Sequence, residues 1–172
     1  MEYRLTTPCT AEDLAPLKAG DTVLLSGVVY TARDQAHRRM TEALEKGEPL
    51  PFDLTGSAIY YVGPTPERPG QVIGSAGPTT SGRMDAMSPR LLDLGNKIMI
   101  GKGKRDDAVK AAVVRNGAVY LAALGGAGAL MAKSVQTLEV IAWPDLGCEA
   151  VRRLIVKDLS LIHISEPTRR SY

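Results

Sequence analysis

The sequence contains little of several residue types that carry metal, redox or stacking chemistry. Its two cysteines, Cys9 and Cys148, lie far apart in 172 residues, so they form neither a disulfide framework nor a CxxC metal site. One Trp and one Phe offer few platforms on which single-stranded nucleic acid could stack. No apolar run approaches the roughly 20 residues that span a bilayer. These shortages argue against disulfide-rich, single-strand-binding and membrane-spanning proteins.

The charge of the chain is nearly balanced. It carries 21 basic and 19 acidic residues, a net charge of +2, which gives no support to a nucleic-acid partner. Hydrophobic residues make up 44% and charged residues 23%, which is typical of a globular domain, and the length favours a single domain with its own core. The first residues, MEYRLTTPCT, lack a secretion signal pattern. We therefore expect a cytoplasmic protein that meets neither membrane nor nucleic acid.

The end of the chain differs in pattern from the rest. Residues 159–172 read LSLIHISEPTRRSY, and the first eleven of them match the translation of a transposase adaptor used in sequencing libraries. Pro167 and two arginines follow an apolar stretch without a cap or turn signal. We therefore expect one domain over 1–158 that lacks its natural C-terminus and with it a final strand, followed by an artefactual tail over 159–172.

Strand and helix patterns alternate along the body of the chain. Helical signals begin with a capping box at Thr10 and Asp13, and Asp34 is expected to cap a later helix. The alternation predicts an α/β fold. Expected strands lie at 22–32, 57–64, 72–78, 97–101, 118–124, 137–143 and 152–158, and expected helices at 34–46, 88–94, 106–115 and after the glycine-rich turn 125–128.

Three junctions that follow expected strands are rich in glycine: 74–83, 101–105 and 125–128. In open α/β sheets ligands bind at such junctions, where exposed backbone N–H groups favour anions. The first junction contains GPTTSGRM, which superficially resembles a Walker A loop. Arg83 replaces the lysine of that motif and Met84 replaces its Mg²⁺-binding hydroxyl, so this interpretation is rejected.

What remains at the first junction is a compact loop with three hydroxyls and a guanidinium, which can hold a carboxylate bidentately. The same residues are typical of an ordinary turn with a surface arginine.

The second junction, GKGKR, either directs Lys102 into a cleft or is a solvated basic turn. The third, GGAG, has no polar side chain; it either packs a helix closely on a strand, which is the favoured interpretation, or lets the backbone approach a ligand. A further trio, Arg33, Asp34 and His37, stands at a strand-to-helix junction.

Together these segments resemble one family. The stretches LKAGDTVLLSGVVYTARDQAHRRM, GSAGPTTSGRMD, KIMIGKGKR and GGAGALMAKSV are similar to the β subunit, or C-terminal domain, of class I iron–sulfur fumarate hydratases and the related L-tartrate dehydratases. The resemblance covers about residues 5–158. It implies a swivelling β/β/α domain. The start at Met1 suggests the version in which α and β are separate chains.

The resemblance also implies roles for individual residues. Thr79 would remove a proton from the methylene carbon of malate, activated by an aspartate of the α subunit. Arg83, Arg33 and Lys102 would bind the carboxylates of the substrate and stabilise the aci-carboxylate intermediate. Thr80 would join the substrate-binding set, and Gly77, with Gly82, would let the backbone approach.

A [4Fe-4S] cluster is implied as well, held by three cysteines of the α subunit and by none of this chain. The expected assembly is a hetero-oligomer with two α–β pairs acting on a small dicarboxylate. The expected activity is the reversible hydration of fumarate to (S)-malate, with tartrate dehydration as a close variant. A stand-alone anion- or nucleotide-binding module, using the same loops, is the alternative from another class.

Overall fold

The computed structural model describes residues 1–123 and 131–165. Within them strands and helices alternate as expected, so the α/β class is confirmed. The strands are β1 Glu2–Thr6, β2 Thr22–Thr31, β3 Ala58–Tyr60, β4 Ile98–Gly101, β5 Val119–Ala122, β6 Val135–Ala142 and β7 Val151–Ser165. The helices are α1 Ala11–Leu14, α2 Asp34–Lys46, α3 Ser88–Asp93 and α4 Asp107–Asn116, with 3-10 turns η1 Ser81–Met84 and η2 Pro144–Glu149.

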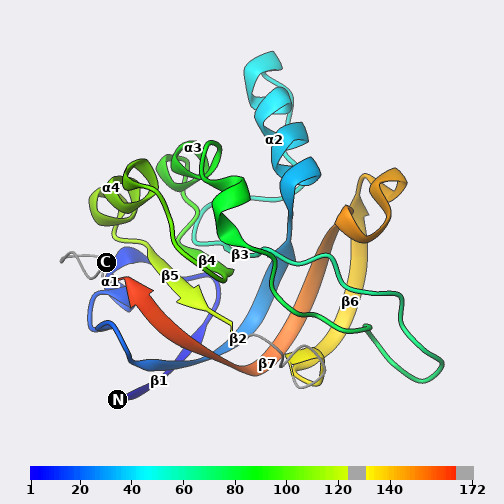
Figure 1. Cartoon of the computed structure of the whole chain (residues 1–172), viewed down its shortest axis with the longest axis horizontal. Helices are drawn as coiled ribbons and strands as arrows, with labels where there is room; N and C mark the ends of the chain where they lie inside the picture. The colour runs from blue at the N-terminus through cyan, green and yellow to red at the C-terminus, as the bar shows by residue number, and fades with distance from the viewer. Residues whose placement is uncertain (124–130, 166–172) are drawn as a thin grey trace.

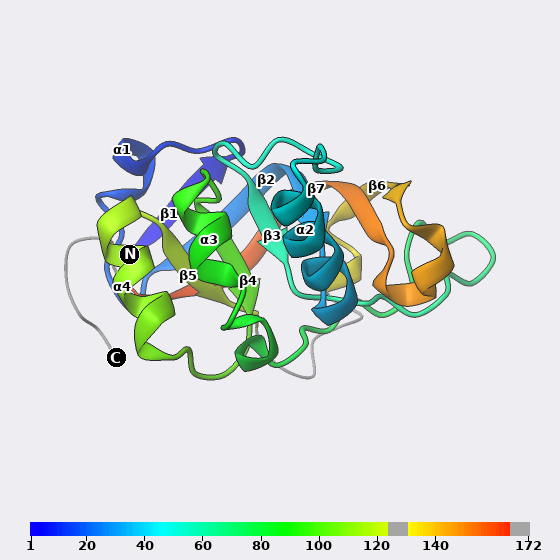
Figure 2. The same cartoon turned by 90° about the horizontal axis from the view of Figure 1, so that it is seen from above.

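The sheet combines a parallel part with an antiparallel closure. Its strand order is β1-β2-β3-β4-β5-β7-β6, and neighbours from β1 to β5 are parallel. The long strand β7 pairs antiparallel with both β5 and β2, which closes the sheet on itself, and β6 extends from the outer part of β7. Helices α2, α3 and α4 lie together on one side of the strands (Figures 1 and 2). The swivelling type of domain stays a prediction.

Alternate residues of the same strands enter two different hydrophobic clusters, as the two-residue period of a strand requires. Tyr60 and Ile98 belong to a cluster formed mainly by strand residues. Their neighbours Tyr61 and Met99 belong to a second cluster that also contains Met40 of α2 and helical residues of α3 and α4. The strands β3 and β4 are therefore covered on both faces, which holds their carboxyl ends in place.

Several local signals are confirmed. Thr10 and Asp13 form the capping box of α1, and Asp106 caps α4 by accepting from the Val109 N–H. Gly47 ends α2 with φ of 70°, in the left-handed region that glycine adopts most easily. Gly27 has φ of 102° and marks the irregularity where the pairing of β2 with β7 shifts.

Three expectations about local structure were wrong. Residues 72–78 form no strand, because this segment turns back and pairs with neither β3 nor β4. Asp34 does not cap α2: the cap position is Arg33, whose side chain makes no capping bond, and the Gln35 N–H in the first turn donates to Glu149 Oε1 at 3.1 Å. Ser88 is the first residue of α3 rather than its cap, and its hydroxyl donates to the Met84 carbonyl. The glycine-rich turn 125–128 lies outside the described residues.

The segment set apart as a tail is continuous with the fold through residue 165. Strand β7 runs on past Asp158, and Leu159, Leu161 and His163 are buried. It is this part of β7 that pairs with β5. The adaptor origin of residues 159–172 stays a prediction, but the described part of this segment supplies the strand that closes the sheet. No helix in the described ranges is long and apolar enough to cross a membrane.

Candidate functional site

The candidate residues follow the carboxyl ends of three adjacent parallel strands. Arg33 comes after β2, the loop that carries Thr79 comes after β3, and Lys102 comes directly after β4. Because these ends meet at one edge of the sheet, the three junctions converge. Two of the glycine-rich junctions noted in the sequence, 74–83 and 101–105, therefore meet at this edge together with Arg33.

The loop with Thr79 is fastened between β3 and β4 by backbone hydrogen bonds. The Thr79 N–H donates to the Tyr61 carbonyl at 2.7 Å, and the Ser81 N–H donates to the Lys102 carbonyl at 2.9 Å. Thr80 forms an isolated parallel bridge with Lys102. These bonds place Thr79 beside Lys102, although the two residues are 23 positions apart in sequence.

Two arginines from different junctions share one carboxylate. Arg83 lies 3.7 Å from Asp34 through Nη1 and Oδ2, and Arg33 lies 3.9 Å from it through Nε and Oδ1. Glu149 of η2 lies 4.0 Å from Arg33 Nε. These separations are too long for hydrogen bonds, so Asp34 and Glu149 neutralise the guanidinium groups without occupying their donors.

The contact between Arg33 and Asp34 leaves two polar atoms unpaired. Arg33 Nε and Asp34 Oδ1 are buried atoms without a hydrogen-bond partner in the part of the chain that the structure describes. Buried polar atoms are normally paired, so the 3.9 Å contact between Arg33 Nε and Asp34 Oδ1 is an exception to this rule. Arg83 is more exposed, with 57% of its side chain accessible against 22% for Arg33. The Arg33 side chain is therefore held among its neighbours, whereas the Arg83 side chain extends further into solvent.

Gly63 makes room for Arg33. A Cβ at this position would lie 3.0 Å from Arg33 Cδ, 3.1 Å from Nη1 and 3.1 Å from the Cys148 carbonyl oxygen. The arginine therefore crosses close to the backbone that leaves β3. The sequence pattern YYVGP did not reveal this packing, since it is typical of any strand that ends in a turn.

The remaining predicted residues are exposed or half-buried. Thr79 is half-buried, while Thr80, Gly77 and Lys102 are exposed. Within the described ranges, neither the Thr79 hydroxyl nor the Lys102 ammonium has a hydrogen-bond partner or ion pair. Among the described residues, the predicted set therefore offers polar groups that are at least partly accessible to solvent.

His37 lies under the Arg33 junction rather than in the site. Its Nδ1 donates to the Arg33 carbonyl at 2.8 Å, and its ring meets Tyr61 edge-on. Burial, assisted by the Arg105 charge, lowers the pKa of His37 to about 4, against the opposing effects of the Arg33 hydrogen bond and the Asp34 charge. The imidazole is therefore neutral near pH 7 and supports α2 as a buried polar core residue.

Sequence reasoning missed a buried ionic group behind the loops. Arg105 has 1% of its side chain exposed, and its Nε donates to Asp85 Oδ1 at 2.6 Å. In the sequence, Arg105 is only one of three basic residues in GKGKR, and no role was predicted for it. The signal that could have found it is the aspartate that follows Arg83 and Met84, since a buried arginine needs a carboxylate partner.

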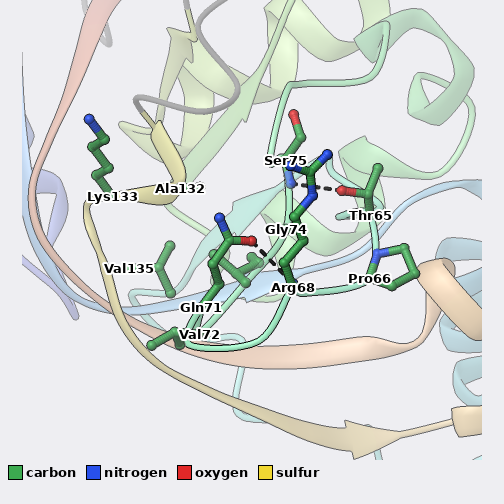
Figure 3. Close-up of a pocket in the computed structure, with 11 residues that line it drawn as sticks. Thr65, Pro66, Arg68, Gln71, Val72, Gly74, Ser75, Ala132, Lys133 and Val135 are labelled. Carbon is green, nitrogen blue, oxygen red and sulfur yellow. Dashed lines mark hydrogen bonds between the residues drawn. The ribbon is translucent and has the colours of Figure 1, made fainter.

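A pocket of about 470 Å³ is lined by residues of the 65–75 segment, which precedes the Thr79 loop in the chain, and by residues next to β6. Figure 3 shows it between the 65–75 segment, with Thr65 and Ser75, and residues 132–135, which lead into β6 and include Lys133 and Val135. The Ser75 N–H donates to Thr65 Oγ1 at 2.7 Å, which folds this segment back on itself. None of the predicted site residues lines the pocket.

No metal-binding cluster was found in the described ranges. No group of three or more His, Cys, Asp or Glu side chains there is arranged to hold an ion. Cys9 is buried, which with nearby Asp13 raises the pKa of its thiol to about 11, and Cys148 is exposed. These residues do not fit an iron–sulfur cluster, whose ligands are thiolates grouped around the metal.

Fold and site together define an α/β domain that presents cations and a threonine on one open edge. The chain belongs to the Fumarase C-terminus family, whose model matches residues 1–166. The resemblance expected from sequence is therefore confirmed.

Relatives of two kinds share this sequence. The chain is 39% identical over 153 residues to fumarate hydratase 2 of Leishmania major, and 36% identical over 149 residues to the aerobic class I fumarate hydratase of Salmonella typhimurium. Each match covers 86% of this chain but only 26% of the relative, so the chain spans about a quarter of these enzymes. It is also 35% identical over 150 residues to the L(+)-tartrate dehydratase subunit beta of Escherichia coli strain K12, covering 86% of this chain and 73% of that subunit.

Proposed function

We propose that this chain is the β subunit of an iron–sulfur hydro-lyase that interconverts fumarate and (S)-malate. The observation that carries the proposal is the convergence of Arg33, Arg83 and Lys102 beside Thr79 at one sheet edge. Several cations suit a dicarboxylate, because each carboxylate gains charge-assisted hydrogen bonds. The family membership supplies the class of reaction.

L-Tartrate is the second candidate substrate. It is favoured by the relative of that name, most of whose length this chain covers. Fumarate, malate and tartrate are all small dicarboxylates, so the same cations would serve each of them. The choice between them therefore rests on groups that face the hydroxyl-bearing carbons, and we assign those to the α subunit.

The open edge supports a site shared between two chains. This chain offers binding groups and a hydroxyl, and its described residues offer no metal site. We assign the [4Fe-4S] cluster to the α subunit, where it would supply a Lewis acid for the substrate hydroxyl and carboxylate. The β chain closes the other side of the substrate and excludes water from it.

In the dehydration direction Thr79 is assigned the proton of the methylene carbon. A threonine hydroxyl is a very weak base, so it must first be deprotonated by a neighbour, for which we propose an aspartate of the α subunit. The electron pair left on carbon moves into the adjacent carboxylate as the aci-carboxylate forms. Arg83, Arg33 and Lys102 stabilise that extra negative charge, which is larger than in the ground state.

The proposal is tested with the anaerobically reconstituted complex of this chain and the α subunit of its own source. Wild-type complex should hydrate fumarate or dehydrate L-tartrate. Thr79→Ala should lower kcat by about 10²- to 10⁴-fold with a smaller effect on KM, because a proton-transfer group is lost. Arg83→Lys should instead raise KM roughly tenfold, because the bidentate fork is lost while the charge remains.

Two outcomes would overturn it. Wild-type turnover in Thr79→Ala would remove the role assigned to this residue. An inactive wild-type complex with an intact cluster, together with anion binding by the isolated chain, would favour the stand-alone binding module.

A further inference from the structure

The buried Arg105 side chain joins the two loops that carry the proposed site residues, one with Thr79 and Arg83 and the other with Lys102. Arg105 lies three residues after Lys102, and its partner Asp85 lies two residues after Arg83. Arg105 Nε donates to Asp85 Oδ1 at 2.6 Å, and the Asp106 N–H donates to Asp85 Oδ2 at 2.9 Å. Both oxygens of the Asp85 carboxylate therefore accept hydrogen bonds from the loop that follows Lys102.

Every polar group of the Arg105 side chain has a defined partner. Its Nη2 donates to Ser88 Oγ at 2.9 Å, and its Nη1 donates to the Tyr61 hydroxyl at 3.3 Å. The guanidinium also lies between two rings, 5.1 Å from the centroid of Tyr61 and 5.0 Å from that of Tyr120. A planar guanidinium held in this way has one geometry, which a lysine could not reproduce.

Tyr120 extends the connection to the loop backbone. Its hydroxyl donates to the Gly103 carbonyl at 2.9 Å, so it accepts from the Ser81 hydroxyl, 2.7 Å away. Burial raises the pKa of Tyr120 to about 12, so the hydroxyl keeps its proton near neutral pH. One phenol thus joins the residue after Thr80 to the residue after Lys102.

A buried ion pair of this kind contributes little to stability, because the cost of taking both charges from water offsets their attraction. Its geometric effect is the better explanation for its presence. We propose that Arg105, Asp85 and Tyr120 are positioning residues, which set the distance of Thr79 and Arg83 from Lys102 without touching the substrate. The expected effect of these residues on turnover rests on the proposed function. Their expected effect on the loops rests on the contacts alone.

Tyr120→Phe is the most direct test, because it removes one oxygen atom and keeps the ring that faces Arg105. In the isolated chain, amide hydrogen exchange of the 79–84 and 102–105 segments should rise at least tenfold while Tm changes little. In the reconstituted complex, kcat should fall about 10- to 100-fold with KM changed less, as expected for misplacement by a fraction of an ångström. Arg105→Lys and Asp85→Asn should also raise exchange in the two segments and lower kcat, and Asp85→Asn should in addition lower Tm, because it leaves the buried Arg105 charge without its partner.

Tyr3→Phe is the matched control, since the Tyr3 hydroxyl makes a 3.4 Å bond to the Pro16 carbonyl far from both loops. It should change neither exchange in the two segments nor kcat. Unchanged exchange in Tyr120→Phe would overturn the positioning role, as would faster exchange with wild-type kcat in an active complex. If the wild-type complex is inactive, the proposed function fails, and the exchange measurement still decides whether these residues fix the loops.

Discussion

Asp34 illustrates how a single residue departs from its sequence signal. Its place before a helical pattern is typical of a cap, yet its carboxylate instead lies between Arg33 and Arg83. No local rule predicts this, because Arg83 approaches only after the chain has formed β3 and returned through the 61–80 loop. The candidate site residues were proposed from motifs, whereas the carboxylates that lie beside the arginines could not be predicted in that way.

His37 provides a prediction at the same scale. The pKa of its imidazole is lowered from 6.5 to about 4 in the folded chain, so the unfolded chain binds more protons between these values. Stability is fully present above about pH 6.5 and is lost as the pH falls towards 4. The loss should be about 3 kcal/mol, measured by urea unfolding at several pH values.

The control for this prediction is His37→Gln, which cannot titrate. Its free energy of unfolding should vary less between pH 7 and pH 4.5 than that of the wild type, even though its absolute stability is lower. His163 is present in both proteins, so the difference isolates His37. Equal pH dependence in the two proteins would show that the buried imidazole does not titrate as described.

At the scale of elements, the fastening of the Thr79 loop against β4 depends on a glycine. A Cβ at Gly101 would lie 2.0 Å from Ser81 Oγ and 2.8 Å from Tyr61 Cδ2. Gly101→Ala must therefore push the loop away from the strand. We expect a loss of about 1–3 kcal/mol in stability, measured by thermal or urea unfolding, together with faster amide exchange at Thr79 and Ser81.

Gly82 is the matched control for Gly101. A Cβ there would meet nothing nearer than 3.9 Å, so Gly82→Ala should change the stability by no more than about 0.5 kcal/mol. If both alanine variants were equally stable, close packing of the loop on β4 would not be what holds it.

Elements with strong local signals were predicted well from the sequence. The capped helices α1 and α4 and the apolar strands β2 and β4 lie close to their expected positions, because cap residues and β-branched runs act locally. The segment 72–78 was mistaken for a strand because its short apolar pattern does not reveal whether a partner strand is available. Here the neighbours of β3 are β2 and β4, and no position remains.

At the scale of the whole molecule, the sheet closes only through the last described residues. Ile162 and His163 of β7 pair with Ala122 and Leu121 of β5, while earlier parts of β7 pair with β2. Alternation in LSLIHIS places Leu159, Leu161 and His163 inside, so this segment serves as the closing strand whatever its origin. The exclusion of this segment from the expected fold followed from its resemblance to an adaptor and not from its hydrophobic pattern.

The arrangement of charge over the molecule also explains why the chain is proposed to act with a partner. Its cations and Thr79 lie on one edge, and the described residues contain no group of side chains that could hold a metal. We therefore propose that the active site is shared between this chain and an α subunit.

That claim is tested most directly by titrating the cluster-loaded α subunit with this chain under anaerobic conditions and following fumarate hydration and L-tartrate dehydration. Each chain alone should be inactive, the isolated chain should bind no iron, and activity should rise to a plateau at one β chain per α chain. Turnover by the isolated chain, or by the α subunit without it, would contradict a shared site.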